Sequence, residues 1–428
     1  MKGEHMREWS NWSGSAVARP SQRVVATSEE QLSAVLKGAE GPVRMVGAGH
    51  SFTPIAAVDG GTQVSLGGFD DVTEAGQLRA RIGAGGQLGD ISRKLHAMGY
   101  AFSNMGDIND QALGGALATA THGSGLEFGC YSSMLSEFTV IDGTGEKRVL
   151  SRDKEGDLFR AMAVGIGTGG VVTEAVMHMA QPYRLDRRRY AIPLNDLLEE
   201  FSSKMSACRN VEFFYITGSG QALVIESDTS SDALIARPED KDQEGLAQLR
   251  MAARFLRWSP RLRRLVLGQA LKSHTQEHFV EEWHKAYPTD RDGIRFNESE
   301  YHLPLEHGPR ALREVVALIE STFPEVYFPM EVRTVAGDDL CLSPFYKRDS
   351  LSIAVHHEAG KPFEGILKAI EDIFAEYQGR PHWGKMHGLE AADLRALYPE
   401  WDLAIEARRE LDPQNRLVTP YIARLLGL

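Results

Sequence analysis

The sequence predicts an α+β protein built from two domains. Three observations carry this prediction: the length of 428 residues, the uneven distribution of glycine, and the alternation of short β-rich runs with helical patterns. A chain of this length exceeds what one hydrophobic core usually supports. Of 42 glycines, 29 lie in residues 1–180 and 13 in the remaining 248, which indicates that the first part is rich in turns and close backbone approaches.

Strands and helices alternate in the first part of the chain. Two helical patterns cover Ser28–Leu36 and Gln87–Met98. The stretch Thr27–Gln31 is suited to cap the first helix, and Gly99 is suited to end the second. Runs rich in β-branched residues predict strands at 43–48, 63–68, 78–85, 137–143 and 171–179.

The composition changes after Pro182, where longer charged and apolar stretches replace the glycine-rich runs. A second domain is therefore expected to begin near Tyr183. Alternating patterns predict strands at 328–334 and 351–358, and helical patterns cover Leu194–Met205, Pro309–Ser321 and Phe363–Tyr377.

The stretch Arg254–Ser273 is basic and amphipathic, which is also typical of helices that lie on a membrane surface. Pro260 interrupts it, and the rest of the chain is acidic. We therefore favour a solvated helix face with an apolar underside over membrane contact.

Composition and charge exclude several classes of protein. A hydrophobic content of 42% and a charged content of 25% are typical of soluble globular proteins, and a net charge of -12 argues against nucleic-acid binding. Cys130, Cys208 and Cys341 lie far apart, so neither a disulfide framework nor a thiolate zinc site is indicated. The N-terminal residues lack the apolar core of a signal peptide, and no run approaches the roughly 18 apolar residues of a membrane span. We expect a cytoplasmic protein with no membrane span that acts on a small molecule.

A glycine-rich turn within Pro42–Gly61 places a single histidine, His50, before a serine. The backbone amides of such a turn favour phosphate oxygens, because small residues let a ligand approach them. An imidazole at this place is able to join a ligand covalently. The alternative is an ordinary loop histidine beside a tight turn, and the segment alone does not decide between the two.

The stretch Asn104–Gly125 is rich in Gly, Ala, Thr and Ser, so an extended ligand is able to lie against its backbone. The hydroxyls of Thr119, Thr121 and Ser124 are candidate hydrogen-bond donors to a pyrophosphate. A turn region that needs small residues for its own packing is the alternative.

A formal GxGxxG match at Gly165–Gly170 does not have the context of a dinucleotide fingerprint. That fingerprint opens a helix after a strand, whereas the residues after Gly170 read as a strand. We interpret this stretch as a turn between a helix at Leu158–Val164 and the strand, which argues against a classical NAD-binding domain.

Taken in order, the His50 loop, the Asn104–Gly125 stretch and the strand after Gly170 resemble the FAD-binding half of the vanillyl-alcohol oxidase superfamily. Near the C-terminus, Arg380–His387 contains RPHWGK, a signature of the sugar-1,4-lactone and alditol oxidases, and ELDPQNRLVTPY resembles their final segment. Thr419 stands where that segment often has asparagine. The resemblance covers essentially the whole chain and looks closer to the bacterial relatives of L-gulono- and D-arabinono-1,4-lactone oxidases.

The resemblance implies a two-domain flavoprotein. It places a PCMH-type FAD-binding domain at 1–182, an α+β cap domain that binds substrate at 183–380, and a C-terminal segment at 381–428 that completes the FAD domain. FAD is implied to be attached through His50, and the absence of a cysteine at 104–106 predicts a single link. The residues implied to contact FAD are Val46, Gly47, Ala48, Gly49, His50, Ser51, Met105, Gly106, Gly115, Thr119, His122, Gly123, Ser124, Gly125, Val172 and His382.

Glu331 and Arg333 project from one face of the strand predicted at 328–334. Alone, they are better explained as a surface ion pair. In the resembling oxidases this Glu-x-Arg pair lies over the flavin, where Glu331 is implied to hold sugar hydroxyls and Arg333 to stabilise negative charge. Lys385 matches the family lysine next to the reacting hydroxyl and is implied to assist its deprotonation.

His356 and Glu358 share a face of the strand predicted at 351–358, where the family places substrate-contacting residues. We expect His356 to belong to the catalytic set and Glu358 to contact substrate, as Ala112 is expected to do. Alditol oxidases carry threonine and serine where this chain has Glu358 and Ala112, which weakens the alditol interpretation.

A zinc site is the competing interpretation of the histidines. Adjacent histidines on a strand point to opposite faces, and HxxxxH is poor helical spacing for one metal, so no metal is expected. The histidines concerned are His356, His357, His382 and His387.

We therefore expect FAD-dependent oxidation of a CH–OH group in a sugar-1,4-lactone or a related polyhydroxylated molecule. Hydride would pass to flavin N5, and O2 would reoxidise the flavin and yield H2O2. The alternatives are an alditol oxidase, a flavin dehydrogenase with another electron acceptor, and a non-redox flavin-binding protein, which the set of Glu331, Arg333 and Lys385 disfavours. The chain is expected to be a monomer.

Overall fold

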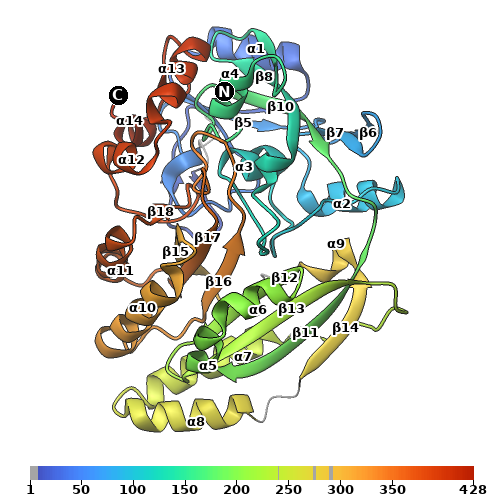
Figure 1. Cartoon of the computed structure of the whole chain (residues 1–428). Coiled ribbons are helices and arrows are strands. Elements are labelled where there is room, and N and C mark those ends of the chain that lie inside the picture. Colours follow the sequence, from blue (N-terminus) through green and yellow to red (C-terminus); the bar gives the residue numbers. More distant parts are fainter. Residues whose placement is uncertain (1–7, 240, 273–275, 289–292) are drawn as a thin grey trace, which may run out of the picture.

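The computed structural model describes residues 8–239, 241–272, 276–288 and 293–428, and Ser273, the last residue of the expected basic helix, lies outside them. Within these ranges the strands form four sheets. The three smaller sheets lie in the first part of the chain, and the largest is formed by the residues after Pro182 (Figure 1). None of the described helices is both long enough and apolar enough to cross a membrane.

Two small sheets and one helix form the N-terminal layer. Ser28 caps α1 (Glu29–Gly38) by accepting a hydrogen bond from the Gln31 amide, as predicted, and Leu32 and Leu36 of this helix are buried against the strands. The hairpin pairs β1 (Trp9–Ser10) with β2 (Val17–Ala18). The parallel sheet has the order β3 (Gln22–Ala26), β5 (Thr62–Leu66), β4 (Val43–Met45), and the 3-10 turn η1 (Pro54–Ala56) follows the His50 loop.

A five-stranded antiparallel sheet forms the second layer, in the order β6 (Val72–Glu74), β7 (Arg79–Gly83), β10 (Gly170–His178), β8 (Leu135–Asp142), β9 (Lys147–Ser151). Gly99 has a φ of +79° and follows the end of the predicted second helix, α2 (Leu88–Ala97). The Gly165–Gly170 stretch is the predicted turn between α4 and β10. The helical elements of this layer are α2 (Leu88–Ala97), α3 (Leu113–Ala118), η2 (Tyr131–Met134) and α4 (Gly156–Met162).

The largest sheet has eight antiparallel strands, in the order β14 (Glu277–Glu282), β11 (Arg184–Pro193), β13 (Gln221–Ser230), β12 (Asn210–Ile216), β16 (Met330–Val335), β17 (Ser350–Glu358), β15 (Phe296–Pro304), β18 (Arg380–Pro381). One face is apolar and packs against helices: Phe213, Val332 and Ile353 belong to the same core as residues of those helices. The helices are α5 (Leu194–Glu199), α6 (Phe201–Ala207), α10 (Gly308–Thr322) and α11 (Glu364–Glu376).

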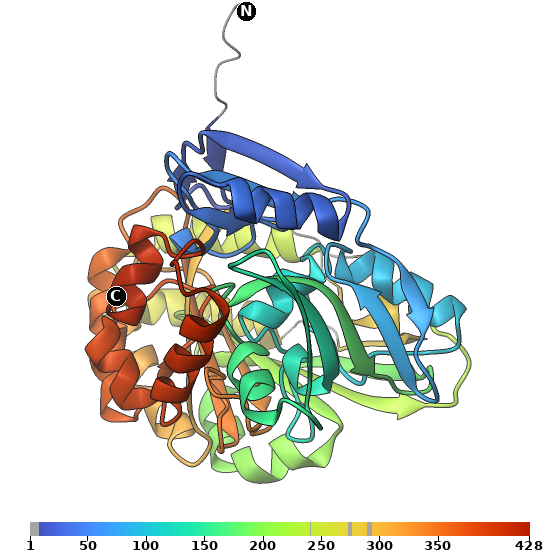
Figure 2. The ribbon, with the colours of Figure 1, turned by 90° about the horizontal axis from the view of Figure 1, so that it is seen from above.

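The C-terminal helices return to the first part of the chain. Trp401 and Leu411 share a core with Phe138 and Phe159, and Figure 2 shows the red helices beside the green strands. These helices are α12 (Ala391–Leu397), α13 (Trp401–Leu411) and α14 (Pro420–Leu426).

Two helix predictions need correction. The single helix expected at Leu194–Met205 is divided, because Glu200 has φ -100° and ψ 15° between α5 and α6. The basic stretch forms the end of α7 (Asp242–Phe255) and α8 (Pro260–Lys272), and a short α9 (Trp283–Ala286) follows. The prediction of a buried apolar side for this stretch is wrong in part. Leu267 and the Arg263 side chain are buried, but the large apolar residues Phe255, Trp258, Leu265 and Val266 are exposed.

Candidate active site

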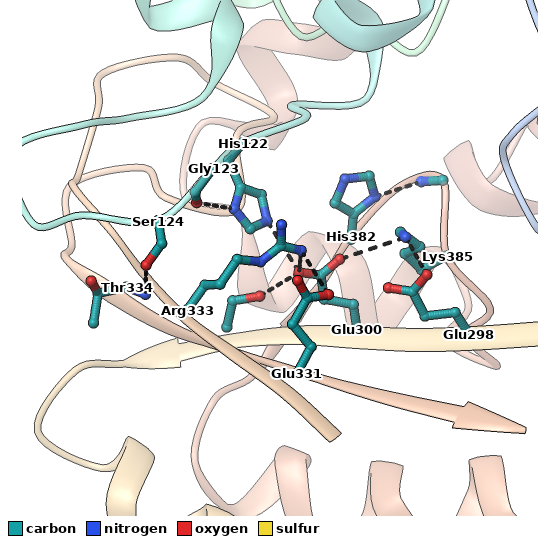
Figure 3. A network of polar contacts seen from close by, with 12 residues as sticks. His122, Gly123, Ser124, Glu298, Glu300, Glu331, Arg333, Thr334, His382 and Lys385 are labelled. Atoms are coloured by element: carbon teal, nitrogen blue, oxygen red, sulfur yellow. Dashed lines mark hydrogen bonds and ion pairs between the residues drawn. The ribbon is translucent and has the colours of Figure 1, made fainter. Parts of the chain in front are cut away.

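The inner face of the eight-stranded sheet is polar and buried. The helices cover its apolar face, so alternation along each strand places charged side chains on the opposite face. Glu298 and Glu300 come from β15, and Glu331 and Arg333 from β16 (Figure 3). These four residues are at most 8% exposed, which is costly for charged groups unless they are paired or serve a function.

Glu300 is the centre of this network. Its Oε1 atom lies 3.1 Å from Nε2 of His122 and accepts hydrogen bonds from Nη2 of Arg333, at 3.2 Å, and from the hydroxyl of Ser352. Burial alone would raise the pKa of Glu300, but Arg333 and His122 outweigh it and hold that pKa well below its usual range. Glu300 is therefore a fixed negative charge that links the His122 loop to the sheet.

Glu331 differs from Glu300 because its carboxyl group is only partly paired. Oε2 lies 3.4 Å from Nη2 of Arg333, while Oε1 is buried without a hydrogen-bond partner among the described residues. Burial raises the pKa of Glu331 to about 8, an effect that Arg333 opposes and that Asp107 and Glu212 reinforce. Glu331 therefore offers an unused oxygen and retains its proton over much of the neutral range.

Lys385 completes the network from a loop after β18. Its Nζ atom donates to Oε2 of Glu298 at 2.5 Å and lies 4.0 Å from Oε2 of Glu300. Nε2 of His356 lies 3.7 Å from the other oxygen of Glu298, and its Nδ1 lies 3.0 Å from the Pro329 carbonyl. Burial alone would raise the pKa of Glu298, but Lys385 and His356 lower it. Glu298 is therefore an anionic carboxylate that lies between the side chains of Lys385 and His356.

The loop of the HWGK motif is fixed by backbone hydrogen bonds to β15. The His382 amide donates to the Glu300 carbonyl at 3.0 Å, and the Met386 amide donates to the Glu298 carbonyl at 2.8 Å. Nδ1 of His382 accepts a hydrogen bond from the Gly384 amide at 3.0 Å, and burial lowers the His382 pKa to about 3. A neutral His382 thus braces the turn that presents Lys385.

The His50 loop borders a cavity of about 600 Å³ in the first part of the chain. Residues from the other glycine-rich stretches complete its wall, so the motifs that the sequence singled out come together here. Of the residues predicted to contact FAD or substrate, the lining includes Val46, Gly47, Ala48, Gly49, His50, Ser51, Ala112, Gly115, Thr119 and Val172.

Three observations show that this cavity fits FAD. A Cβ atom added at Gly115 would meet no other atom within 4 Å, so it would project into open space in the wall. Gln111 also lines the cavity, and its amide oxygen is buried without a partner among the described residues. Many of the lining residues are glycine or alanine, which exposes backbone amides to an extended phosphate-containing ligand. His50 stands on the rim between this cavity and the HWGK loop, since the Phe52 amide donates to the Gly384 carbonyl at 2.7 Å.

The N-terminal hairpin supports the His50 loop from outside. The Trp12 amide donates to the Gly49 carbonyl at 2.8 Å, and Nδ2 of Asn11 donates to the Ser51 carbonyl at 2.8 Å. Oδ1 of Asn11 accepts from the Ala16 amide at 3.0 Å, which closes the hairpin. The residues on both sides of His50 are therefore held by one short segment.

Arg44 joins the strand before this loop to two distant parts of the chain. Its buried guanidinium donates to the carbonyls of Ile55, Ile166, Gly167 and Leu417. The wall of the cavity therefore depends on a single side chain that holds the His50 loop, the glycine turn before β10 and the C-terminal segment together.

The remaining residues predicted to contact FAD do not line this cavity. Ser124 instead bonds to β12 and β16, through the Val211 carbonyl and the Thr334 amide. Thr119 does line the cavity, but its hydroxyl donates to the Gly115 carbonyl at 3.0 Å. The Thr121 hydroxyl, outside the lining, is buried without a partner among the described residues. The residues outside the lining are Met105, Gly106, His122, Gly123, Ser124, Gly125 and His382.

Glu358 lies at the end of β17 on the same face as His356, but its carboxylate is already engaged. Oε1 accepts from Nη2 of Arg250 at 2.7 Å, and Oε2 accepts from the Tyr327 hydroxyl at 2.9 Å. Among the described residues, the four histidines of the zinc interpretation form no common group, and His357 stacks against Phe363 on the opposite face of the sheet.

Sequence reasoning missed four residues of the site: Glu298, Glu300, Gln111 and Arg44. The signal for the first two is the pattern of acidic residues at alternate positions in FNESEYHLP, which is unusual in a strand buried on both faces. Arg44 carries no such signal, because three of its four hydrogen bonds reach carbonyls more than 120 residues away. Gln111 carries none either, since nothing in its local sequence marks its side chain as unpartnered.

Comparisons with known proteins find similarity over almost the whole chain. Residues 175–425 match the family described as D-arabinono-1,4-lactone oxidase, and residues 20–151 match the family described as FAD binding domain. L-gulono-1,4-lactone dehydrogenase of Mycobacterium tuberculosis is 34% identical over 98% of this chain and 99% of its own length. Alditol oxidase of Streptomyces sp. is 28% identical over 97% of this chain and 98% of its own length. In fold, the chain is similar to a solvent-stable cholesterol oxidase, with a TM-score of 0.79 at 17% identity over 98% of this chain and 97% of that one.

Proposed function

The chain belongs to the D-arabinono-1,4-lactone oxidase family, and from this premise we propose that it is an FAD-dependent oxidoreductase that oxidises a CH–OH group of a sugar-1,4-lactone or a related polyol. The observation that carries the proposal is the position of the Lys385, Glu298, Glu331 and Arg333 network. It adjoins the rim of a cavity that fits FAD, at the point where the His50 loop and the HWGK loop share a hydrogen bond.

FAD, when bound, supplies the acceptor for the two electrons and the hydrogen that leave the carbinol carbon. The residues that would hold it are those of the His50 loop and of the wall around Gly115. We propose that His50 also forms a covalent link to it. The protein groups then have to orient the carbinol and take up its hydroxyl proton.

Lys385 is the group that we propose to receive the hydroxyl proton. An ammonium group cannot accept a proton without losing one, so Nζ passes one of its own protons to the anionic Oε2 of Glu298, within hydrogen-bond distance, as it receives the hydroxyl proton. Glu298 therefore serves as the partner that makes Lys385 a base. Arg333 stabilises the negative charge that develops on the alkoxide.

Glu331 is proposed to bind a substrate hydroxyl through its unpartnered Oε1 atom. The buried carboxylates of Glu298 and Glu300 disfavour an anionic sugar acid, because another negative charge would be repelled in a site that excludes water. A neutral lactone or polyol suits this environment. The engaged Glu358 would then form part of the wall beside the substrate.

The test is anaerobic reduction of the flavin by a panel of sugar-1,4-lactones, alditols and sugar acids, followed by absorbance. We expect lactones to bleach the flavin faster than alditols, and sugar acids to have little effect. Absence of bleaching by every polyhydroxylated compound would reject the proposal. A monomeric protein of the cytoplasm remains our expectation.

The electron acceptor needs a separate measurement. We propose O2 as the acceptor, with H2O2 as the product, but the relative at 34% identity is named a dehydrogenase, which favours another acceptor as the second candidate. Stopped-flow mixing of the reduced enzyme with oxygenated buffer distinguishes them, since fast reoxidation supports the oxidase and slow reoxidation supports the dehydrogenase.

A further inference from the structure

Helices α7 and α8 carry an exposed surface that combines large apolar side chains with arginines. We infer that this surface, formed by Met251, Phe255, Trp258, Leu265 and Val266 with Arg254, Arg257 and Arg261, docks on the anionic surface of a lipid bilayer. The inference goes beyond the proposed function and does not depend on it. It concerns where the protein is held, rather than the reaction.

Exposed apolar side chains are concentrated here. Of the twelve exposed large hydrophobic residues in the described ranges, five lie between Met251 and Val266. Trp258 is 74% exposed, Leu265 64% and Phe255 62%, values that are unusual for such side chains in a protein that has no partner at that surface. Met251 and Phe255 are one turn apart on α7, so they project from one side of the helix.

The exposed Trp258 lies in the turn between the two helices, next to the end of α7. The indole N–H of Trp258 donates to the Phe255 carbonyl at 2.9 Å, which fixes the tryptophan at the turn between α7 and α8. Figure 1 shows both helices at the edge of the molecule opposite α1, with α8 along the outer margin. Tryptophan and phenylalanine in such a position are the side chains that membrane-surface proteins insert at the level of the lipid headgroups.

The charge of the surface selects the partner. From Arg250 to Lys272 the chain has seven basic residues and no acidic residue, although the whole protein has a net charge of -12. Arg263 is buried and bonds to main-chain carbonyls, and Arg250 pairs with Glu358. Among the described residues, Arg254, Arg257 and Arg261 are exposed and form no ion pair. An acidic protein that concentrates unpaired arginines beside exposed aromatic residues is complementary to anionic lipid.

The opposite side of α7 packs close to the candidate active site. Leu246, Leu249 and Ala253 contact the aromatic cluster that contains Phe52 and Phe296. Nζ of Lys385 lies 5.0 Å from the centre of the Phe52 ring. A bilayer bound at the outer side of α7 would therefore lie one helix away from the wall of the active site.

The experiment is co-sedimentation of the purified full-length holoenzyme with vesicles of phosphatidylcholine alone and of phosphatidylcholine mixed with phosphatidylglycerol. We expect binding to the anionic vesicles that weakens as salt is added, and little binding to the neutral ones. The double variant Arg257→Gln/Arg261→Gln should bind about 25-fold more weakly, at about fivefold per arginine. Phe255→Ser/Trp258→Ser should bind at least tenfold more weakly.

Matched controls separate this surface from charge and apolarity elsewhere. Arg313→Gln/Arg409→Gln removes two exposed arginines outside the surface, and Leu234→Ser/Ile235→Ser removes two exposed apolar residues. Both control variants should bind as the unmodified protein does, and all variants should retain its thermal unfolding midpoint. No binding to anionic vesicles, or equal loss in the controls, would overturn the inference. So would a dimer, seen by light scattering without lipid, that Phe255→Ser/Trp258→Ser converts to a monomer, since the surface would then bind a second copy of this chain.

Discussion

The amide of Phe52 donates a hydrogen bond of 2.7 Å to the carbonyl of Gly384, and this bond joins two motifs that are more than 300 residues apart. A Cβ atom added at Gly384 would lie 3.0 Å from the Ser51 hydroxyl, so the two loops are also in close contact. His50 therefore stands beside the turn that presents Lys385. Any movement of one loop changes the distance between His50, the proposed cofactor anchor, and Lys385, the proposed base.

Lys385 and Glu298 are expected to act as one unit. Lys385→Met should slow flavin reduction by substrate at least 100-fold, because the hydroxyl proton loses its acceptor. Glu298→Gln should slow it by a similar factor, since Lys385 then has no carboxylate to receive its own proton. Stopped-flow absorbance under anaerobic conditions measures both rates.

The double variant tests the coupling between these two residues. If they act together, Lys385→Met/Glu298→Gln should be no slower than Lys385→Met alone. Lys368→Met, on the exposed side of α11, is the control and should reduce flavin at the normal rate. Additive losses in the double variant would show that Glu298 acts independently of Lys385.

Much of this site could be predicted from local sequence, and the reason is physical. His50, Glu331, Arg333 and Lys385 stand in short motifs whose spacing fixes their geometry, as a turn or as one face of a strand. Comparison with known families supports FAD and the oxidoreductase class that these motifs indicated. The caps of α1 and α2 were predicted for the same local reason.

The parts that escaped prediction depend on distant contacts. Glu300 has its role because His122, from the first part of the chain, lies 3.1 Å from its carboxylate, and no local pattern specifies that meeting. Likewise, the exposed apolar side of α7 and α8 could not be predicted. A helical pattern separates an apolar side from a polar side, but it does not show which of them packs against the core. The sequence pattern assigned the apolar side to the interior, and the buried Arg263 shows that a charged residue took part of that interior.

The raised pKa of Glu331 should make the free energy of unfolding depend on pH in a defined direction. In the folded protein the pKa of Glu331 is raised to about 8, whereas in the unfolded chain this carboxyl group loses its proton near its ordinary pKa of 4.5. Between these values the native state binds more protons, so this residue makes the free energy of unfolding fall as pH rises. Glu331→Gln cannot titrate, and its stability relative to the unmodified protein should therefore increase from about pH 5 to pH 9.

Urea unfolding at several pH values measures that difference. The same variant should also remove the inflection near pH 8 from the profile of kcat/KM, since Glu331 is proposed to bind a substrate hydroxyl. Glu314→Gln, on the solvent side of α10, is a suitable control. A difference in stability that is constant across the pH range would contradict the shifted titration of Glu331.

His50→Ala should release FAD when the protein is precipitated with acid, while the unmodified protein should keep its yellow colour in the pellet. Asn11→Asp is the sharper variant, because it keeps the acceptor for the Ala16 amide and loses the donor to the Ser51 carbonyl. We expect Asn11→Asp to fold normally and to carry a smaller fraction of covalent flavin. A colourless pellet from the unmodified protein would show that FAD is not covalently attached.

Arg44→Met should destabilise the protein by about 3 kcal/mol or more, because several buried carbonyls lose their hydrogen-bond donor together. The control is Arg19→Met, which breaks an exposed ion pair with Glu8 and should change stability by less than about 0.5 kcal/mol. The midpoint of urea unfolding gives both values. Equal effects of the two substitutions would mean that Arg44 does not hold the wall of the cavity.

Gly115→Val tests whether the cavity is the FAD site without disturbing the fold. A side chain at this position meets no protein atom within 4 Å of its Cβ, and the residue lies in a helix, so valine should be tolerated by the chain itself. The added methyl groups would occupy space in the cavity wall, and we expect the purified variant to contain much less FAD.

Gly365→Val, in α11, also meets nothing within 4 Å and serves as the matched control. Circular dichroism should be unchanged in both variants, and only Gly115→Val should lose the absorbance of bound flavin. Full FAD content in Gly115→Val would place the cofactor elsewhere, because a ligand in contact with this wall could not ignore a branched side chain there.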